Sequence, residues 1–327
     1  MTKYIIKRIL MIIPIVLGVI LILFVLLYFL AGSSIRQMPI FGGGDALDKI
    51  FTFFGADDNF ITKYIRYCYN ILFKLDFGRA GDIGFNVTRE LKYRIRNTLL
   101  LLGSGVGATL LIGIPAGAYA AIHKNRIGDR VINLVTLLFS SIPNFSVAFF
   151  LTLFFAVYLR ILPVLISYTS PKAFIMPALT IALGGVASIA RMTRASMLET
   201  LEQPYIIALR SKGLREADVV YRHAMKNALV PIVSALGGLV SQLLLGTLVV
   251  EHFFSVPGLG SLMMTSVGMR DHNTILGCAA ILTIILTVTN IITDILYAFI
   301  NPQIRLLYAG KRAAYREKGR RNEDENG

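Results

Sequence analysis

The sequence predicts an all-α protein that crosses a membrane six times, and two observations lead to this prediction. Of the 327 residues, 55% are hydrophobic and only 16% are charged, whereas a soluble domain of this length carries more charge. The chain also contains apolar runs close to the ~20 residues with which a helix crosses ~30 Å of hydrocarbon. We place the six spans at residues 9–31, 98–122, 131–159, 173–190, 228–250 and 274–300.

The distribution of basic residues predicts that both ends of the chain are cytoplasmic. The formal net charge is +14, and the cytoplasmic loops of membrane proteins are enriched in Lys and Arg. With the N-terminus inside, the two short outer loops hold only Arg160, Lys172 and Arg270, whereas each inner segment has a basic cluster. This asymmetry accounts for the positive charge better than nucleic-acid binding does. We therefore expect a lipid membrane as a partner and no nucleic acid.

The predicted topology divides the chain into four regions. Residues 1–31 form the cytoplasmic start and the first span, whose apolar run is too long for a signal peptide that is cleaved. Residues 32–97 form an outer loop. Residues 98–300 form a core of five helices that contains a cytoplasmic loop at 191–227. The tail at 301–327 is strongly charged, and we expect it to be disordered.

The outer loop contains a segment with the pattern of an amphipathic helix. Its basic residues Lys63, Arg66 and Lys74 fall between apolar residues near helical spacing. Two arrangements remain open, namely a helix lying on the outer membrane surface and a cap packed on the helix bundle. The apolar residues are Ile61, Tyr64, Ile65, Tyr69, Leu72 and Phe73.

Motifs for chemistry on the chain itself are missing from the sequence. No stretch matches the P-loop pattern G-x-x-x-x-G-K-[ST], and "PGLGSLM" at 257–263 lacks its lysine. The pairs Glu251-His252 and Asp271-His272 fall in the last outer loop, but no ligand-type spacing links them to a metal site. We therefore expect no catalytic residue, no metal site and no cofactor in this chain.

Polar residues inside the predicted spans are few, and Asp294 is the only carboxylate among them. An ionisable group in a membrane is a candidate functional residue. Asp294 lies near the inner end of its span with Asn290 one turn earlier. We favour a structural role, either hydrogen bonding between helices or, for Asp294, pairing with a nearby arginine, over a proton relay, which requires a chain of such groups.

The stretch "SSIPNFS" at 140–146 interrupts the third span with a proline and several polar residues. Proline frees a backbone carbonyl group, which in a membrane has to face protein or water. A simple proline kink is one explanation, and a bent helix that lines a translocation path is the other. We favour the path and assign Ser140, Ser141, Pro143 and Asn144 to it.

The segment "YIIALRSKGLREADVVYRHAMKN" at 205–227 is polar and basic although it lies between two apolar spans. Gly213 divides it into two short helical patterns. DNA binding is disfavoured because the apolar face is small and the segment is tethered to a membrane. We interpret the segment as a docking surface for a protein, with small residues for close approach and basic residues at the rim. The small face comprises Ala217, Val220, Ala224 and Ala228.

The longer stretch "RASMLETLEQPYIIALRSKGLREADVVYRHAMKNALVPIV" resembles the cytoplasmic EAA loop of ABC importer permeases in the oligopeptide, dipeptide and nickel family. Further matches are "KLDFGRAG", "LIGIPAGAYAA", "SIPNF", "VVEHFFSVPGLGSLM" and "INPQIRLL", so the resemblance covers nearly the whole chain. The sequence departs from the family pattern at four positions. These are Pro204, Ile207, which replaces the glutamate of the motif, Leu209 and Asn301.

The resemblance implies a type I ABC importer fold in a bacterial cytoplasmic (inner) membrane. It also implies a second related permease subunit, two cytoplasmic ATPase subunits that bind ATP and Mg, and an extracytoplasmic substrate-binding protein. The EAA loop then serves as the coupling helix that enters a groove of the ATPase. Carried over by position, the coupling residues are Tyr205, Ala208, Arg210, Lys212, Gly213 and Leu214.

Peptides are the cargo that the resemblance implies first, with nickel or another metal chelate as the alternative. An integral membrane enzyme or a membrane scaffold is the competing class of function. An enzyme needs a nucleophile, a general base or a metal set near the membrane surface, and the sequence offers none of these.

Overall fold

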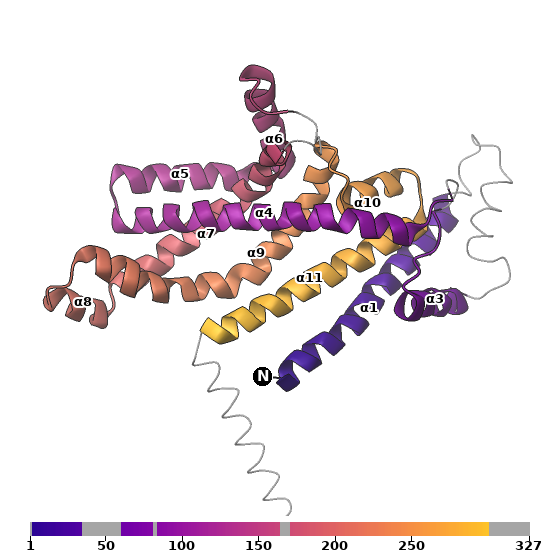
Figure 1. Ribbon diagram of the computed structural model, residues 1–327, viewed down its shortest axis with the longest axis horizontal. Helices are drawn as coiled ribbons and strands as arrows, with labels where there is room; N and C mark the ends of the chain where they lie inside the picture. Colours follow the sequence, from indigo (N-terminus) through magenta and orange to yellow (C-terminus); the bar gives the residue numbers. More distant parts are fainter. Residues whose placement is uncertain (1, 35–59, 81–83, 164–170, 301–327) are drawn as a thin grey trace, which may run out of the picture. The chain divides into compact units, whose positions relative to one another are not determined.

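The computed structural model describes residues 2–34, 60–80, 84–163 and 171–300, which are drawn as ribbons in Figure 1. All regular structure in these ranges is helical apart from one isolated bridge between Arg79 and Asn86. The longer helices are α1 (Thr2–Ser34), α4 (Val87–Ile122), α5 (Ile127–Ser141), α7 (Ile175–Leu201), α9 (Met225–Phe253) and α11 (His272–Ile300). The shorter ones are α3 (Phe60–Tyr69), η2 (Asn70–Lys74), α6 (Asn144–Leu151), η3 (Thr152–Tyr158), η4 (Pro171–Phe174), α8 (Pro204–Ser211), η5 (Asp218–Ala224) and α10 (Leu259–Gly268).

The structure confirms the all-α prediction with several membrane spans. Within the described ranges, five helices are long and apolar enough to cross a membrane, and the number becomes six if α5 with α6 and η3 forms one broken span. The five are Arg8–Leu27, Val87–Ile122, Lys172–Leu201, Asp218–Phe253 and His272–Tyr297. The charged tail predicted at 301–327 and the glycine-rich part of the outer loop lie outside the described residues.

The predicted third span is interrupted where the sequence placed its proline. α5 ends at Ser141 and α6 begins at Asn144, and Pro143 between them is extended, with φ of −60° and ψ of 145°. Proline has no backbone N–H and disfavours helical geometry at the preceding residue, here Ile142. The single span predicted at 131–159 is therefore two helical pieces.

Several helices extend beyond the apolar runs that predict them. α4 begins at Val87, well before residue 98, and the helix that contains the fifth span begins at Asp218, well before residue 228, and continues to Phe253. Their added turns are polar, as in Glu90 and Arg94, which form an ion pair at 2.9 Å. Helices begin and end at capping signals, so a search for apolar runs underestimates their length.

The chain divides into two compact units. The first unit comprises residues 1–108, 141–185 and 241–288, and the second comprises 109–140, 186–240 and 289–327. α4, α7, α9 and α11 contribute residues to both units.

In the first unit, α3 packs one side against α1. The Tyr64 hydroxyl donates a hydrogen bond to the Leu17 carbonyl oxygen (2.9 Å), and its ring meets Phe24 edge-on at 5.9 Å. Burial raises the pKa of Tyr64 to about 12. The other apolar side of this segment is exposed, and Phe73 keeps 75% of its surface. The amphipathic segment thus packs on a helix as a cap does while leaving an apolar stripe open.

Candidate functional site

The predicted docking segment, residues 205–227, folds as a helix, a tight turn and a second helix. Pro204 is the first residue of α8, where its fixed φ and missing N–H are tolerated. α8 ends at Ser211, and Gly213 follows with φ of +79°. Glycine adopts this conformation without steric cost, and the Gly213 N–H donates to the Arg210 carbonyl oxygen (2.9 Å). The turn predicted at Gly213 is therefore confirmed.

The small apolar residues of the segment face inward, which corrects the prediction that they meet a partner. Val220, Ala224 and Ala228 are buried in a core cluster of the second unit together with Met197 of α7. Only Ala217 of the four is exposed. A helix buries its apolar stripe against the nearest apolar surface, and α7 offers that surface within the same chain.

Most of α8 is exposed, and Ile206 is its buried residue. We use the name α8 face for five exposed residues, four of them in α8 and Lys212 directly after it, namely Tyr205, Ile207, Ala208, Arg210 and Lys212. Ile207 keeps 54% of its surface although it is apolar. Gly213 is exposed as well, whereas Leu214 is half-buried and packs on the core cluster. The structure therefore exposes five of the six residues that the resemblance assigned to coupling.

Two side-chain contacts hold the shape of this segment. The Asn227 Nδ2 donates to the Tyr205 hydroxyl (2.6 Å), which connects α8 to the start of α9. Arg210 donates from Nε and Nη2 to the two carboxylate oxygens of Glu216 (3.0 and 2.6 Å), across the turn at Gly213. This hydrogen bonding by Arg210 lowers the pKa of Glu216.

A buried carboxylate that the sequence analysis missed lies at the start of α5. Asp129 is 2% exposed and forms a bidentate ion pair with Arg194 of α7, with distances of 2.6 and 2.8 Å. It also accepts hydrogen bonds from the Asn125 backbone N–H (2.9 Å) and the Asn133 Nδ2 (2.7 Å). Both carboxylate oxygens therefore have two donors, which is how proteins accommodate a buried charge.

Ser140, a residue assigned to the translocation path, belongs to the same unit. Its hydroxyl donates to the Thr136 carbonyl oxygen (2.6 Å) and accepts from Arg191 Nη1 of α7 (2.5 Å). Arg191 Nη1 also donates to the Thr136 carbonyl oxygen (3.2 Å). The α5 end of the proline break is therefore attached to an arginine side chain.

The other three path residues lie in the first unit. Ser141 and Pro143 are exposed, and Asn144 is half-buried. The Asn144 side chain lies against two glycines, because a Cβ atom built on Gly184 would be 3.1 Å from its Oδ1 and one on Gly246 would be 2.7 Å from its Nδ2. Side chains larger than hydrogen at these positions would displace the amide, so the glycines create the space for Asn144.

The two residues assigned to structural roles in the last span lie in the second unit. A Cβ atom built on Gly237 of α9 would be 2.8 Å from Asn290 Oδ1 of α11, so these helices approach closely there. Asp294 is half-buried one turn later. This neighbourhood is compatible with the predicted contact between helices.

Glu251, weighed from the sequence as a metal ligand, binds backbone instead. It is 0% exposed, and its Oε2 accepts hydrogen bonds from the N–H groups of Gly260 (2.7 Å) and Ser261 (3.2 Å) in the first turn of α10. The same corner is closed by Thr98 Oγ1, which accepts from the Leu259 N–H (2.8 Å). The carboxylate therefore caps a helix N-terminus, where it satisfies N–H groups that have no partner within the helix.

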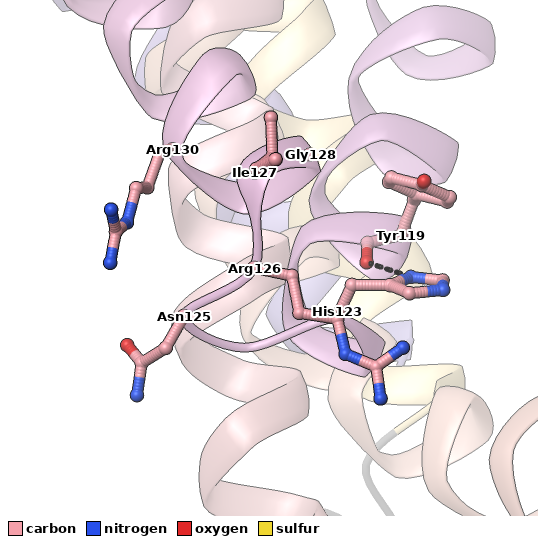
Figure 2. A pocket seen from close by; sticks show the side chains of 7 residues that line it. All are labelled: Tyr119, His123, Asn125, Arg126, Ile127, Gly128 and Arg130. Atoms are coloured by element: carbon pink, nitrogen blue, oxygen red, sulfur yellow. Dashed lines mark hydrogen bonds between the residues drawn. The ribbon is translucent and has the colours of Figure 1, made fainter.

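The turn between α4 and α5 forms an open pocket of about 540 Å³, shown in Figure 2. His123 Nδ1 donates to the Tyr119 carbonyl oxygen (3.0 Å), and the two rings lie 4.2 Å apart. Arg126 and Arg130 extend from the turn, and none of the lining residues is acidic. The turn thus has the basic surface that the sequence analysis predicted for the cytoplasmic side.

Comparison with solved structures defines the class of fold. The chain is similar to one in a structure titled "Inward facing conformations of the MetNI methionine ABC transporter", with a TM-score of 0.55 and 17% identity over 65% of this chain and 97% of that one. It is also similar to one in "Crystal structure of an amino acid ABC transporter with histidines", with a TM-score of 0.52 and 18% identity over 64% and 94%. At these identities the likeness establishes the fold alone, which is that of an ABC importer transmembrane domain.

Sequence comparison defines the family. Residues 113–306 match the family described as binding-protein-dependent transport system inner membrane component. The chain is 32% identical to the dipeptide transport system permease protein DppB of Bacillus subtilis (strain 168), over 94% of this chain and 99% of that protein. The chain therefore belongs to this family of ABC transporter permeases and is a multi-pass membrane protein.

Two further relatives match over a similar extent. The glutathione transport system permease protein GsiC of Shigella flexneri serotype 5b (strain 8401) is 33% identical, over 93% of this chain and 99% of that protein. The oligopeptide transport system permease protein AppB of Bacillus subtilis (strain 168) is 31% identical, again over 93% and 99%. The resemblance inferred from the motifs is thereby confirmed.

Proposed function

We propose that this chain is the permease subunit of an ATP-driven importer of short peptides and forms half of its translocation pathway. The observation that carries the proposal is its likeness, over almost the whole chain, to permeases named for dipeptides, oligopeptides and glutathione. Glutathione is itself a small peptide, so the three names share one chemical class of cargo.

The partners follow from the same proposal. A second, related permease completes the pathway, an extracytoplasmic protein delivers the peptide, and two cytoplasmic ATPase subunits bind ATP and Mg. The chain lies in a bacterial cytoplasmic membrane with both ends inside. With both ends inside, the basic turn at Arg126 and Arg130 and the basic α8 face both lie on the cytoplasmic side. Cytoplasmic loops are the ones enriched in Lys and Arg, which supports this orientation.

The α8 face is the docking surface for one ATPase subunit. An exposed isoleucine beside basic side chains suits a protein interface, where an apolar centre is surrounded by a charged rim. The packing of Val220, Ala224 and Ala228 beneath it gives the face a rigid support. Movement of the ATPase is then transmitted to the helices that continue from both ends of the segment, α7 and α9.

The test is uptake by proteoliposomes that contain the chain with the second permease and the ATPase subunits, supplied with the binding protein. We expect uptake of a radiolabelled dipeptide that requires ATP inside the vesicles and competition by unlabelled peptides. A nickel chelate serves as the matched competitor. Competition by the chelate but not by peptides would replace the cargo in the proposal, and uptake without ATP would contradict the importer itself.

A further inference from the structure

We infer that the ion pair of Asp129 and Arg194 fastens α5 to the end of α7 that leads into the docking segment, so that the two move as one body during transport. Both residues lie in the second unit, as does the α8 face. The inference rests on the proposed function, because it assigns a route by which movement of the α8 face reaches the α5 side of the proline break.

The fully buried positions of α5 within the described structure are polar. Its only fully buried residues are Asp129 and Thr136, and both are bonded to arginines of α7. Most of its apolar side chains are exposed, as Val131, Leu134, Leu137 and Leu138 show, whereas Ile132 and Phe139 are half-buried. Within the described residues, α5 has no apolar side chain that is fully buried, so the bonds from the two arginines are its main attachment to α7.

The two arginines hold α5 at its start and at its end. Arg194 binds Asp129 in the first turn, and Arg191 donates to Thr136 and Ser140 near the last turn. Residues 129 and 140 are about 16 Å apart along a helix. Attachment at two separate points prevents both sliding and rotation of α5 on α7, which a single contact would permit.

α7 is in turn attached to the docking segment. The Ser196 hydroxyl donates to the Ala228 carbonyl oxygen (3.0 Å) at the start of α9. Met197 is packed in the core cluster together with Ile206 of α8. A bidentate Arg–carboxylate pair fixes orientation as well as distance. A displacement of α8 therefore moves α7, and α7 moves α5 with it.

The first test is the ratio of peptide taken up to ATP hydrolysed in the reconstituted complex. Asp129→Asn keeps the size of the side chain and removes its charge. We expect the complex to assemble and hydrolyse ATP, while uptake per ATP falls about tenfold, within the range typical of coupling between sites. An unchanged ratio in a correctly assembled complex would overturn the inference. The same holds if uptake and hydrolysis both fall by the same factor, because the ratio is then also unchanged.

The chain offers a matched control and a test of the pair. Lys124 and Glu202 form an ion pair at 3.1 Å between the turn after α4 and the end of α7, but their side chains are 50% and 71% exposed. Glu202→Gln is expected to leave the ratio unchanged. Arg194→Gln combined with Asp129→Asn is expected to lower the ratio no more than either change alone, because both remove the same bond. An additive loss would show that the residues act separately.

A distance measurement separates this inference from the proposed function, because it requires no ATPase and no transport. Spin labels are attached to cysteines at exposed Leu134 on α5 and exposed Glu199 on α7, with the buried Cys68 and Cys278 replaced by alanine. We expect one narrow distance distribution in the parent chain and in Glu202→Gln, and a broad one in Asp129→Asn. An equally narrow distribution in Asp129→Asn would contradict the fastening, whatever the uptake assay shows.

Discussion

Glu251 illustrates how a single side chain organises a turn of this protein. A completely buried carboxylate accepts two backbone N–H groups of α10, and Gly258 and Gly260 leave the space that the carboxylate occupies. The corner is completed by Asn97, whose Nδ2 donates to the Pro257 carbonyl oxygen (2.9 Å). The "EHFFSVPGLG" stretch is therefore a hydrogen-bonded corner within the first unit.

Glu251→Ala is expected to destabilise the protein. The change removes the acceptor of the buried Gly260 N–H and of the partly buried Ser261 N–H, and a buried group without a partner costs about 1–3 kcal/mol. The midpoint of thermal unfolding in mild detergent measures the effect. Glu251→Gln is the control, since its amide oxygen still accepts a hydrogen bond and the midpoint should fall less. An alanine variant as stable as the parent chain would refute the capping role.

Gly246→Ala tests the contact between Asn144 and its glycine neighbours. The added methyl group would meet Asn144 Nδ2, and overpacking of this kind costs about 1–3 kcal/mol. We expect a lower unfolding midpoint that Asn144→Ala partly restores in the double variant. Gly238→Ala in the same helix is the control, because a Cβ atom there meets nothing within 4 Å. Equal effects of the two glycine changes would show that Asn144 is not held in place by this contact.

At the scale of elements, the sequence predicted the apolar helices and the special backbone positions. Apolar runs located the spans, Pro143 located the break, and Gly213 located the end of α8, because each depends on local chemistry alone. The burial of Asp129 and Glu251 was not predicted. Each residue lies just beyond the apolar run that defined its span, so it was assigned to a loop. Their partners are contributed by other helices or by a later turn, and spacing in one sequence does not reveal them.

The prediction that the small residues of the second helical pattern meet a partner was wrong for a related reason. Val220, Ala224 and Ala228 have the spacing of an interaction face, and a sequence alone does not say whether that face meets a partner or the same chain. The exposed side of the segment comes from α8 instead, where Ile207 is apolar and uncovered.

The pair of Arg210 and Glu216 predicts a pH dependence of the docking segment. The folded structure lowers the pKa of Glu216 from its ordinary value of 4.5 through its bond to Arg210. The ion pair therefore stabilises the folded docking segment fully above pH 4.5, and this stabilisation is lost as the pH falls through the lowered pKa of Glu216. It is small because both side chains are partly exposed.

Hydrogen exchange of residues 205–216 in detergent measures this dependence. After correction for the intrinsic exchange rate, protection is expected to decrease as the pH falls below 4.5 in the parent chain. In Glu216→Gln it should be lower at neutral pH and change less with acid. The same acid response in both chains would mean that another group is responsible.

At the scale of the whole molecule, the proposed function makes this chain a subunit that transmits movement from an ATPase to the membrane helices. In this proposal the α8 face receives the ATPase, and the polar contacts of Arg191 and Arg194 extend from α7 to α5. Several conspicuous polar residues of the described structure bind backbone groups or each other, as Glu251 and Asp129 do.

Co-purification of this chain with its ATPase subunit from native membranes in mild detergent tests the central claim most directly. Ala208→Trp adds bulk to the exposed α8 face without disturbing the core, and Ile127→Trp does the same at the exposed basic turn as the control. We predict that the ATPase is recovered with the parent chain and with Ile127→Trp, but is lost with Ala208→Trp. Recovery of the ATPase with all three chains would contradict docking at the α8 face, and its absence from all three would contradict the importer itself.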